Sequence, residues 1–381
     1  MRAAISTNRP FHFVMLANAL RAHATEIEIF SSAPRKFFKG LDTMVKTRIV
    51  PAPLTILEHL MFPRMAESFL LMELPVYDLA VLTVIGAPDI AVGQCSTCLF
   101  TGRAVKKRGG KFVLDRACPH RDYQRDRLQR EADKLGVQLT KQPTWFRDRQ
   151  LEEYEMADAI LVPSAYTSES FPPGLQHKLV KAPLLGRTKI GERTSVLRNK
   201  VFTVGVVGGS PIRKGYLYLL EAWKRLSLPN ARLLIRSKGF ADLPVLDEMA
   251  RSMPNVELVG YFPDISDFYN LCDIFVLPSV DDGFGMALFE AMGNSVPCIA
   301  TTSCGASELL TSGVDSIVVE PACEDELAKA ILHLYSSEET RFEMGRAGAR
   351  TVQRVAASRL YEKAIDSLFS KLFPSAVEAQ R

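Results

Sequence analysis

The stretch Asp281-Asp282-Gly283-Phe284-Gly285-Met286-Ala287-Leu288-Phe289-Glu290-Ala291-Met292-Gly293 decides how this chain folds. The apolar run 274–279 comes directly before it and predicts a buried parallel strand. The two glycines predict a turn whose backbone can approach a ligand closely, and the residues after them predict a helix. Because the amino end of that helix would point at the ligand, the stretch predicts a phosphate-binding site.

The predicted helix is apolar on nearly every face, so we expect it to be buried, with Glu290 as its one carboxylate. A buried carboxylate needs hydrogen-bond partners, and sugar hydroxyls beside a bound phosphate would supply them. In a simpler interpretation Asp282 only caps the helix, the glycines only turn the chain, and Glu290 reaches solvent. We favour the ligand site, because the simpler interpretation leaves the coincidence of these features unexplained.

A second glycine-rich segment, Gly208-Gly209-Ser210-Pro211-Ile212-Arg213-Lys214-Gly215, follows another apolar run and precedes another predicted helix. In this context glycines and basic side chains hold phosphates. Arg213 and Lys214 can neutralise a diphosphate, although Arg-Lys-Gly is also common in solvated turns. Arg236 and Lys238, after the next predicted strand, are weaker candidates for the same role.

The segment from Asp282 to Glu290, continuing into 296–301 and 305–309, resembles the signature of family 4 of the retaining glycosyltransferases. In that family two acidic residues with seven residues between them flank the sugar nucleotide. Glu290 matches the second, and Asp282 stands where the first is usually Glu. The resemblance covers residues 140–355 well and the front third poorly.

The resemblance extends to the second glycine-rich segment, where Lys214 matches the family pattern. Gly209 stands where the family usually has an arginine, and Arg213 is our candidate to replace the missing charge. The family commonly has a histidine in the loop after a front-half strand, and His120 follows the predicted strand that ends at Asp115. His120 is therefore expected to contact the sugar or the acceptor, although a surface histidine is the alternative.

The expected site follows from these segments and the resemblance. The catalytic residues are predicted to be His120, Arg213, Lys214 and Glu290. The residues predicted to bind the nucleotide sugar are Gly208, Gly209, Tyr261, Asp282, Gly283, Phe284, Gly285, Met286 and Ala287. A retaining transferase must stabilise a departing diphosphate and an oxocarbenium-like sugar, which calls for positive charge and amide donors rather than a strong base.

No metal site and no cofactor are predicted. Metal-dependent transferases often carry an Asp-x-Asp ligand pair, whereas Asp281 and Asp282 are adjacent, which makes shared coordination of one metal awkward. Cys95 and Cys98 have the spacing of a zinc or redox pair, but no second pair follows them. The nucleotide diphosphate sugar is expected to be a donor substrate.

Strands and helices alternate along both halves, which predicts an α/β fold with parallel sheets covered on both faces. Strands are expected near 2–6, 26–30, 79–83, 111–115, 159–163, 201–207, 231–235, 256–260 and 274–279. The resemblance implies a GT-B fold, two doubly wound Rossmann-like domains that face each other across a cleft. The expected domains are 1–190 on the acceptor side and 191–355 on the nucleotide-sugar side, with the terminal helix within 356–381 packing back on the first.

The composition fits this organisation. A chain of 381 residues is long enough for two domains, and seven scattered cysteines do not make a disulfide framework. No run of about 18 apolar residues occurs, and residues 1–6 resemble a first strand rather than a signal peptide. We therefore expect a cytoplasmic protein.

Charge differs between the halves. Residues 1–200 hold 30 Lys and Arg against 20 Asp and Glu, a balance of +10, whereas residues 201–381 hold 17 against 23, a balance of −6. The basic half suggests an anionic acceptor or the inner face of a membrane, although a solvated basic face is the alternative. The amphipathic region 54–72 could add membrane contact or could pack into the core. Nucleic acid is not expected, because no binding module is recognisable.

The sequence thus predicts a metal-independent, hexosyltransferase-type enzyme of polysaccharide or glycoconjugate biosynthesis. It would transfer a sugar, with retention, from a nucleotide diphosphate sugar to a glycan or lipid-linked acceptor, as a peripheral membrane protein. Two alternatives stay open. One is a GT-B-fold binding or assembly protein without activity, suggested by the altered positions Gly209 and Asp282. The other is a sugar-nucleotide epimerase or hydrolase on the same fold.

Overall fold

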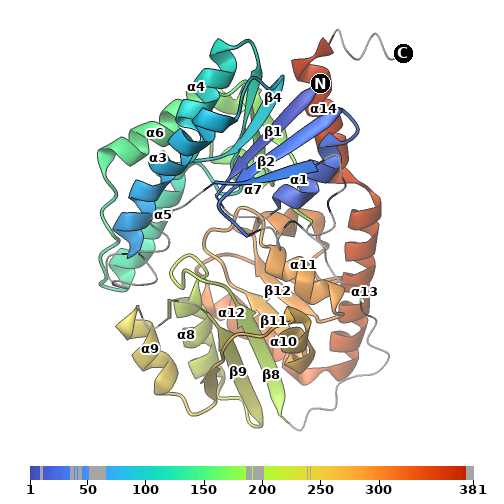
Figure 1. The fold of residues 1–381 in the computed structure, drawn as a ribbon. Coiled ribbons are helices and arrows are strands. Elements are labelled where there is room, and N and C mark those ends of the chain that lie inside the picture. Colours follow the sequence, from blue (N-terminus) through green and yellow to red (C-terminus); the bar gives the residue numbers. More distant parts are fainter. Residues whose placement is uncertain are drawn as a thin grey trace.

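The computed structural model describes residues 1–8, 12–34, 38, 41, 45–50, 66–185, 191, 201–237, 239–240 and 242–374. Within these ranges the chain forms two parallel β-sheets, one in each half, with helices on both faces of each (Figure 1). The predicted α/β fold with two doubly wound halves is confirmed.

The first sheet has seven strands in the described part of the chain, in the order β3-β2-β1-β4-β5-β6-β7, and all neighbours run parallel. Strand order reverses between β1 and β4, which are direct neighbours although a long segment separates them in the sequence. In open α/β sheets such a reversal marks the place where ligands bind, at the carboxyl ends of the strands. The strands are β1 (Arg2–Thr7), β2 (Glu26–Ser31), β3 (Val45–Ile49), β4 (Ile90–Gln94), β5 (Lys111–Asp115), β6 (Ala159–Val162) and β7 (Leu179–Lys181).

The second sheet has six strands among the described residues, in the order β10-β9-β8-β11-β12-β13, again all parallel. Here the order reverses between β8 and β11. The loops after these two strands are the two glycine-rich segments of the sequence. The strands are β8 (Phe202–Val207), β9 (Ala231–Arg236), β10 (Val256–Leu258), β11 (Ile274–Leu277), β12 (Cys298–Thr301) and β13 (Ile317–Val319).

The central strands are continuous apolar runs, because helices cover both faces of each sheet. Every residue of β8 and β11 is buried. The helices of the first half are α1 (Phe13–Leu20), α3 (Ala66–Val84), α4 (Leu99–Lys107), α5 (Arg121–Lys134), α6 (Thr144–Met156) and α7 (Ala165–Glu169). Those of the second half are α8 (Tyr216–Leu226), α9 (Pro244–Arg251), α10 (Ile265–Leu271), α11 (Met286–Gly293) and α12 (Glu324–Ser336).

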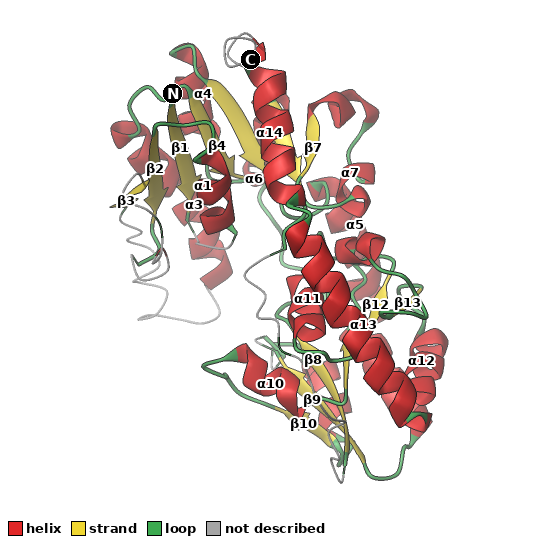
Figure 2. Ribbon diagram, turned by 90° about the vertical axis from the view of Figure 1, so that its right-hand side faces the viewer, coloured by secondary structure: helices red, strands yellow, loops and turns green. Residues whose placement is uncertain are grey.

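Two terminal helices cross from the second half back to the first. Figure 2 shows α13 (Glu338–Ala357) along the second half and α14 (Leu360–Leu372) continuing it beside the first. One terminal helix was expected from residue 356 onward. Instead α13 ends at Ala357 and α14 begins at Leu360, because Arg359 between them has a left-handed φ of 52°. On α14, Phe369 stacks on His23 with ring centroids 4.1 Å apart, which ties this helix to the end of α1.

The strand expected at 79–83 is wrong, because these residues lie within α3. The buried side chains of that segment include Leu74, Tyr77, Val81 and Ile85, which recur at helical spacing. Strands β3, β4, β7, β12 and β13 were not predicted. Residues 54–65 of the expected amphipathic region lie outside the described residues.

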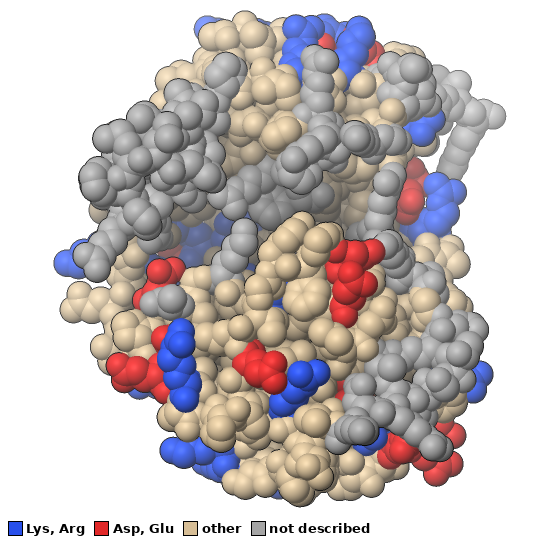
Figure 3. All heavy atoms as spheres, turned by 60° about the horizontal axis from the view of Figure 1, so that its bottom comes forward, with Lys and Arg blue, Asp and Glu red and all other residues tan. Residues whose placement is uncertain are grey.

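The surface of the second half carries mixed charge. Figure 3 brings this half forward and shows acidic and basic side chains scattered over it, with a recess between the halves in which basic side chains are visible. In the described part of the chain, no helix is both long enough and apolar enough to cross a membrane.

Candidate functional site

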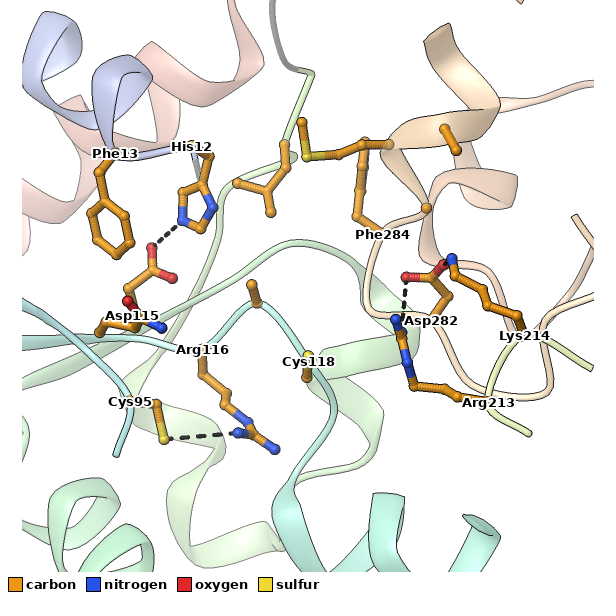
Figure 4. Close-up of a pocket in the computed structure, with 16 residues that line it drawn as sticks. His12, Phe13, Cys95, Asp115, Arg116, Cys118, Arg213, Lys214, Asp282 and Phe284 are labelled. Carbon is orange, nitrogen blue, oxygen red and sulfur yellow. Dashed lines mark hydrogen bonds and ion pairs between the residues drawn. The ribbon is translucent and has the colours of Figure 1, made fainter. Parts of the chain in front are cut away.

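The loops at the two strand-order reversals line one cavity of about 390 Å³ between the halves. The first half contributes loops after β1, β4 and β5, and the second half contributes loops after β8 and β11 (Figure 4). The lining residues are His12, Phe13, Gln94, Cys95, Asp115, Arg116, Ala117, Cys118, Leu184, Arg213, Lys214, Asp282, Phe284, Gly285, Met286 and Ala287.

Two cations and one carboxylate form the second-half wall of the cavity. Lys214 Nζ contacts Asp282 Oδ2, and Arg213 Nη1 lies 3.5 Å from the other carboxylate oxygen, Oδ1. Burial opposes ionisation of Asp282, but the charges of Lys214 and Arg213 outweigh it and hold its pKa below its ordinary value. The group therefore carries one net positive charge at neutral pH, which suits it to an anionic ligand.

The amino end of α11 lies next to these charges. Gly285 precedes the helix with a φ of +86°, and a Cβ there would lie 2.4 Å from Cys304 Sγ, so the turn requires glycine. The first-turn amides of Met286 and Ala287 have no acceptor within the helix, and both residues line the cavity. Positive charge and free amide donors thus meet in one place, as an oxyanion or phosphate requires.

A second cavity of about 260 Å³ lies at the carboxyl ends of β8, β9 and β10. It is lined by Gly208, Gly209, Arg236, Ser237, Val259, Gly260 and Tyr261. The Arg236 guanidinium lies 5.7 Å from the centre of the Tyr261 ring, so a flat cation and an aromatic ring are adjacent there. A Cβ on Gly208 would lie 2.8 Å from Lys214 Cε, so the lysine stem runs directly past this glycine.

Gly283 lies at the contact between the halves. Its carbonyl oxygen accepts hydrogen bonds from Ser164 Oγ at 2.7 Å and Thr167 Oγ1 at 3.2 Å. A Cβ on Gly283 would lie 2.0 Å from the carbonyl oxygen of Ala117. The residue before this loop, Asp281, is fully buried and accepts hydrogen bonds from first-half side chains as well.

His120 lies at the start of α5. It is the N-cap of α5, where its Nδ1 accepts a hydrogen bond from the amide of Asp122 at 3.3 Å. Its ring packs against Tyr154 and Phe171, with centroids 5.1 and 5.2 Å away, and burial lowers its pKa. Among the described residues that line either cavity, His120 does not appear.

Glu290 is half-buried rather than buried, and it too is missing from the described lining of both cavities. Its Oε2 accepts a hydrogen bond from Tyr269 Oη at 2.9 Å. It shares a half-buried helix face with Met286 and Ala287, whereas the rest of α11 is mostly buried. Its carboxylate therefore has a protein partner without any ligand.

The structure brings together seven of the predicted residues, namely Arg213, Lys214, Asp282, Phe284, Gly285, Met286 and Ala287. It places three more, Gly208, Gly209 and Tyr261, at the neighbouring cavity. The sequence analysis missed the first-half wall, which includes His12, Gln94, Asp115 and Arg116. The sequence feature that could have identified these residues is their position at or just after the ends of strands. No group of three or more His, Cys, Asp or Glu that could hold a metal occurs among the described residues.

Comparison with known proteins agrees with this architecture. Residues 198–337 match the family model described as "Glycosyl transferases group 1". The capsular polysaccharide biosynthesis glycosyltransferase CapM of Staphylococcus aureus is 27% identical over 191 residues, 49% of this chain and 50% of CapM. The chain thus spans about half the length or less of the curated relatives it matches.

Solved structures match over nearly the whole chain. The sucrose-phosphate synthase of Thermosynechococcus elongatus superposes with a TM-score of 0.73 at 17% identity, covering 98% of this chain and 100% of that one. HepE of Anabaena, in complex with UDP-glucose, gives a TM-score of 0.69 at 15% identity, covering 97% and 100%. The fold is therefore the GT-B fold of glycosyltransferases.

Proposed function

We propose that this protein is a glycosyltransferase whose donor is a nucleotide diphosphate sugar. The main observation behind this proposal is the cavity wall formed by Arg213, Lys214 and the amino end of α11. Two cations and free amide groups face one cavity there. The match of residues 198–337 to a glycosyltransferase family and the UDP-glucose complex of HepE support the proposal.

The diphosphate would lie on this wall, where Lys214 and the α11 amides neutralise the charge that develops as it departs. On binding, the phosphates would compete with Asp282 for Lys214 and Arg213. The base would extend into the neighbouring cavity, because the Lys214 stem runs past Gly208 at the border of the two. There Tyr261 and Arg236 offer a face for stacking.

The finer features of the reaction follow from the resemblance to family 4 and from the relatives. We infer transfer of a hexosyl group with retention to a hydroxyl of a glycan or lipid-linked acceptor in polysaccharide biosynthesis, the pathway that the name of CapM states for that protein. The +10 balance of residues 1–200 favours an anionic acceptor near a membrane surface.

The proposal is tested by calorimetric titration with UDP and GDP and by nucleotide release from a panel of UDP- and GDP-sugars. We expect one nucleoside diphosphate to bind and its sugar derivative to be turned over. Failure of every nucleotide to bind would favour the binding or assembly protein, and release with hydrolysis or epimerisation alone would favour the other alternative.

Replacing Glu290 by glutamine should reduce turnover at least tenfold, about 1.4 kcal/mol, if its carboxylate contacts the sugar or ribose as predicted. The loss should appear in turnover without a lower thermal midpoint. Tyr269→Phe is the matched control, because it removes the hydroxyl that bonds to Glu290 Oε2 and leaves the carboxylate in place. Equal turnover of Glu290→Gln and wild type would remove Glu290 from the site.

Chelation with EDTA should leave most of the transfer or donor-hydrolysis activity intact, because protein cations are proposed to neutralise the diphosphate. The measurement compares rates before and after EDTA and again after adding Mg²⁺ or Mn²⁺. A loss that either metal restores would show that the diphosphate is held through a metal.

A further inference from the structure

Arg116 is a deeply buried cation on the first-half wall of the main cavity. It follows Asp115 at the end of β5, is only 9% exposed, and lines the cavity together with Cys95 and Cys118. Figure 4 shows its side chain extending toward Cys95, whereas the group around Asp282 lies apart from it. The cavity therefore has positive charge on both walls, not only where the diphosphate is proposed to bind.

One edge of the Arg116 guanidinium holds its own loop. Nε and Nη2 both donate to the carbonyl oxygen of Pro119, at 3.0 and 2.6 Å. Among the described residues the third nitrogen, Nη1, contacts only Cys95 Sγ at 3.8 Å, and a thiol is a weak acceptor. The neighbouring nitrogens Nη1 and Nη2 therefore still have N–H groups for a ligand. Such a flat pair of donors matches the two oxygens of a carboxylate or a phosphate.

No carboxylate pairs with Arg116 in the described part of the chain. Asp115, the preceding residue, contacts His12 instead, with Oδ2 2.8 Å from Nε2. The other buried Lys and Arg residues described each lie within 4.0 Å of a carboxylate; they are Arg121, Arg149 and Lys214, which pair with Asp122, Asp78 and Asp282. A buried charge without a counter-charge lowers stability, and an anionic ligand would offset that loss.

Arg149 shows how the same half holds an arginine that serves the fold. Its Nη2 contacts Asp78, and its Nε lies 3.6 Å from Glu153 and donates to the carbonyl oxygen of Ser96 at 3.0 Å. It is absent from the described lining of the main cavity. Arg116 differs on both points, because it lines the cavity and pairs with no described carboxylate. A charge is not needed to hold one carbonyl oxygen, so the charge of Arg116 points to a ligand.

We propose that Arg116 binds an anionic group of the acceptor, a carboxylate or a phosphate carried by the sugar; this inference rests on the proposed function. The donor diphosphate is assigned to the wall with Lys214 and Arg213, so an anion at Arg116 belongs to the molecule bound against the first half. Both walls belong to one cavity of about 390 Å³. The anionic group therefore lies close to the attacking hydroxyl, not on a distant part of a polymer, and neutral sugars should be poor acceptors.

The test uses anionic probes on protein already saturated with UDP or GDP, whichever wild type prefers, so that the second-half wall is occupied. The probes are inorganic phosphate, glucose 6-phosphate and glucuronate, with methyl glucoside as the neutral control. Binding is measured by calorimetric titration at constant ionic strength. We expect wild type to bind at least one anionic probe and Arg116→Gln to bind it about tenfold more weakly, because one charge-assisted contact is lost. Methyl glucoside should not distinguish the two proteins.

Thermal midpoints separate ligand binding from a role in folding. Arg116→Gln keeps an amide that can donate to Pro119 and removes a charge without a counter-charge, so its midpoint without ligand should equal or exceed that of wild type. Arg116→Lys keeps the charge without the flat pair of donors and should retain part of the probe affinity. Arg149→Gln is the matched control, because it leaves Asp78 without its cation. Its midpoint should fall, while the folded protein should bind the probes as wild type does.

The inference is overturned if no anionic probe binds to nucleotide-saturated wild type, or if Arg116→Gln binds the probes within about threefold of wild type. It is also overturned if Arg116→Gln weakens the nucleoside diphosphate as much as the probes, because Arg116 would then hold the donor. Selective loss of glucose 6-phosphate or of glucuronate would support it and identify the group as phosphate or carboxylate. If wild type binds neither UDP nor GDP, the proposed function fails, and the acceptor assignment fails with it.

Discussion

Lys214→Met should weaken the binding of UDP or GDP, whichever the wild-type protein prefers, by about tenfold to a hundredfold. A charge-assisted hydrogen bond to phosphate contributes roughly 1.5–3 kcal/mol, and Lys214 is one of two cations proposed to hold the diphosphate. The corresponding nucleoside should lose little affinity, because it carries no phosphate. Isothermal titration with both ligands measures the difference.

Removing Lys214 also leaves the buried Asp282 with Arg213 as its remaining cation, so the single variant should have a lower thermal midpoint. The double variant Lys214→Met with Asp282→Asn removes both charges and should recover much of the stability. It should not recover diphosphate affinity, since the lysine is still missing. If affinity returned with stability, or if nucleoside and diphosphate were affected equally, Lys214 would not contact the phosphates.

Gly283→Ala should damage both stability and activity. Its Cβ would lie 2.0 Å from the Ala117 carbonyl oxygen, and neither atom belongs to a flexible side chain. The two loops must therefore separate by more than an ångström, which strains the bonds from Ser164 and Thr167. Overpacking of this kind costs about 1–3 kcal/mol, and it would widen the cavity on which turnover depends. Thermal midpoint and donor hydrolysis should both fall.

Gly174→Ala is the matched control for this variant. Gly174 is exposed, has no atom within 4 Å of an added Cβ, and does not have a left-handed φ. The same methyl group should therefore leave the midpoint and the rate unchanged there. A Gly283→Ala protein that also matched wild type would show that the halves separate freely at this contact.

The fold could be predicted because most central strands are apolar runs followed by turn residues. Strand β4 was not predicted because three of its five residues, Ala91, Gly93 and Gln94, do not favour strands. It needs small residues, since a Cβ on Gly93 would lie 2.5 Å from Cys98. The run 79–83 was mistaken for a strand because its four apolar residues and Thr83 fit either a strand or a helix until the longer helical spacing is considered.

The second-half wall could be predicted because its residues lie on two short segments, each with a glycine-rich turn. The first-half wall could not, because His12 and Asp115 are 103 positions apart and meet only through the sheet order β1-β4-β5. For the same reason sequence spacing could not reveal that Tyr269 would supply the partner of Glu290. Site residues that lie on one short segment can be predicted from the sequence, whereas contacts that depend on the order of strands in a sheet cannot.

The burial of Asp281 limits which first halves can be joined to this second half in a chimeric protein. Its carboxylate belongs to the second half, but Tyr166 Oη at 2.8 Å and Gln124 Nε2 reach it from the first. Beside it, Arg127 donates to Ser303 Oγ at 3.0 Å. A chimera with a first half from another protein of this fold would bury this carboxylate without partners, a penalty of several kcal/mol. Exchange of the first half therefore requires matching hydrogen-bond donors on the incoming α5 and α7.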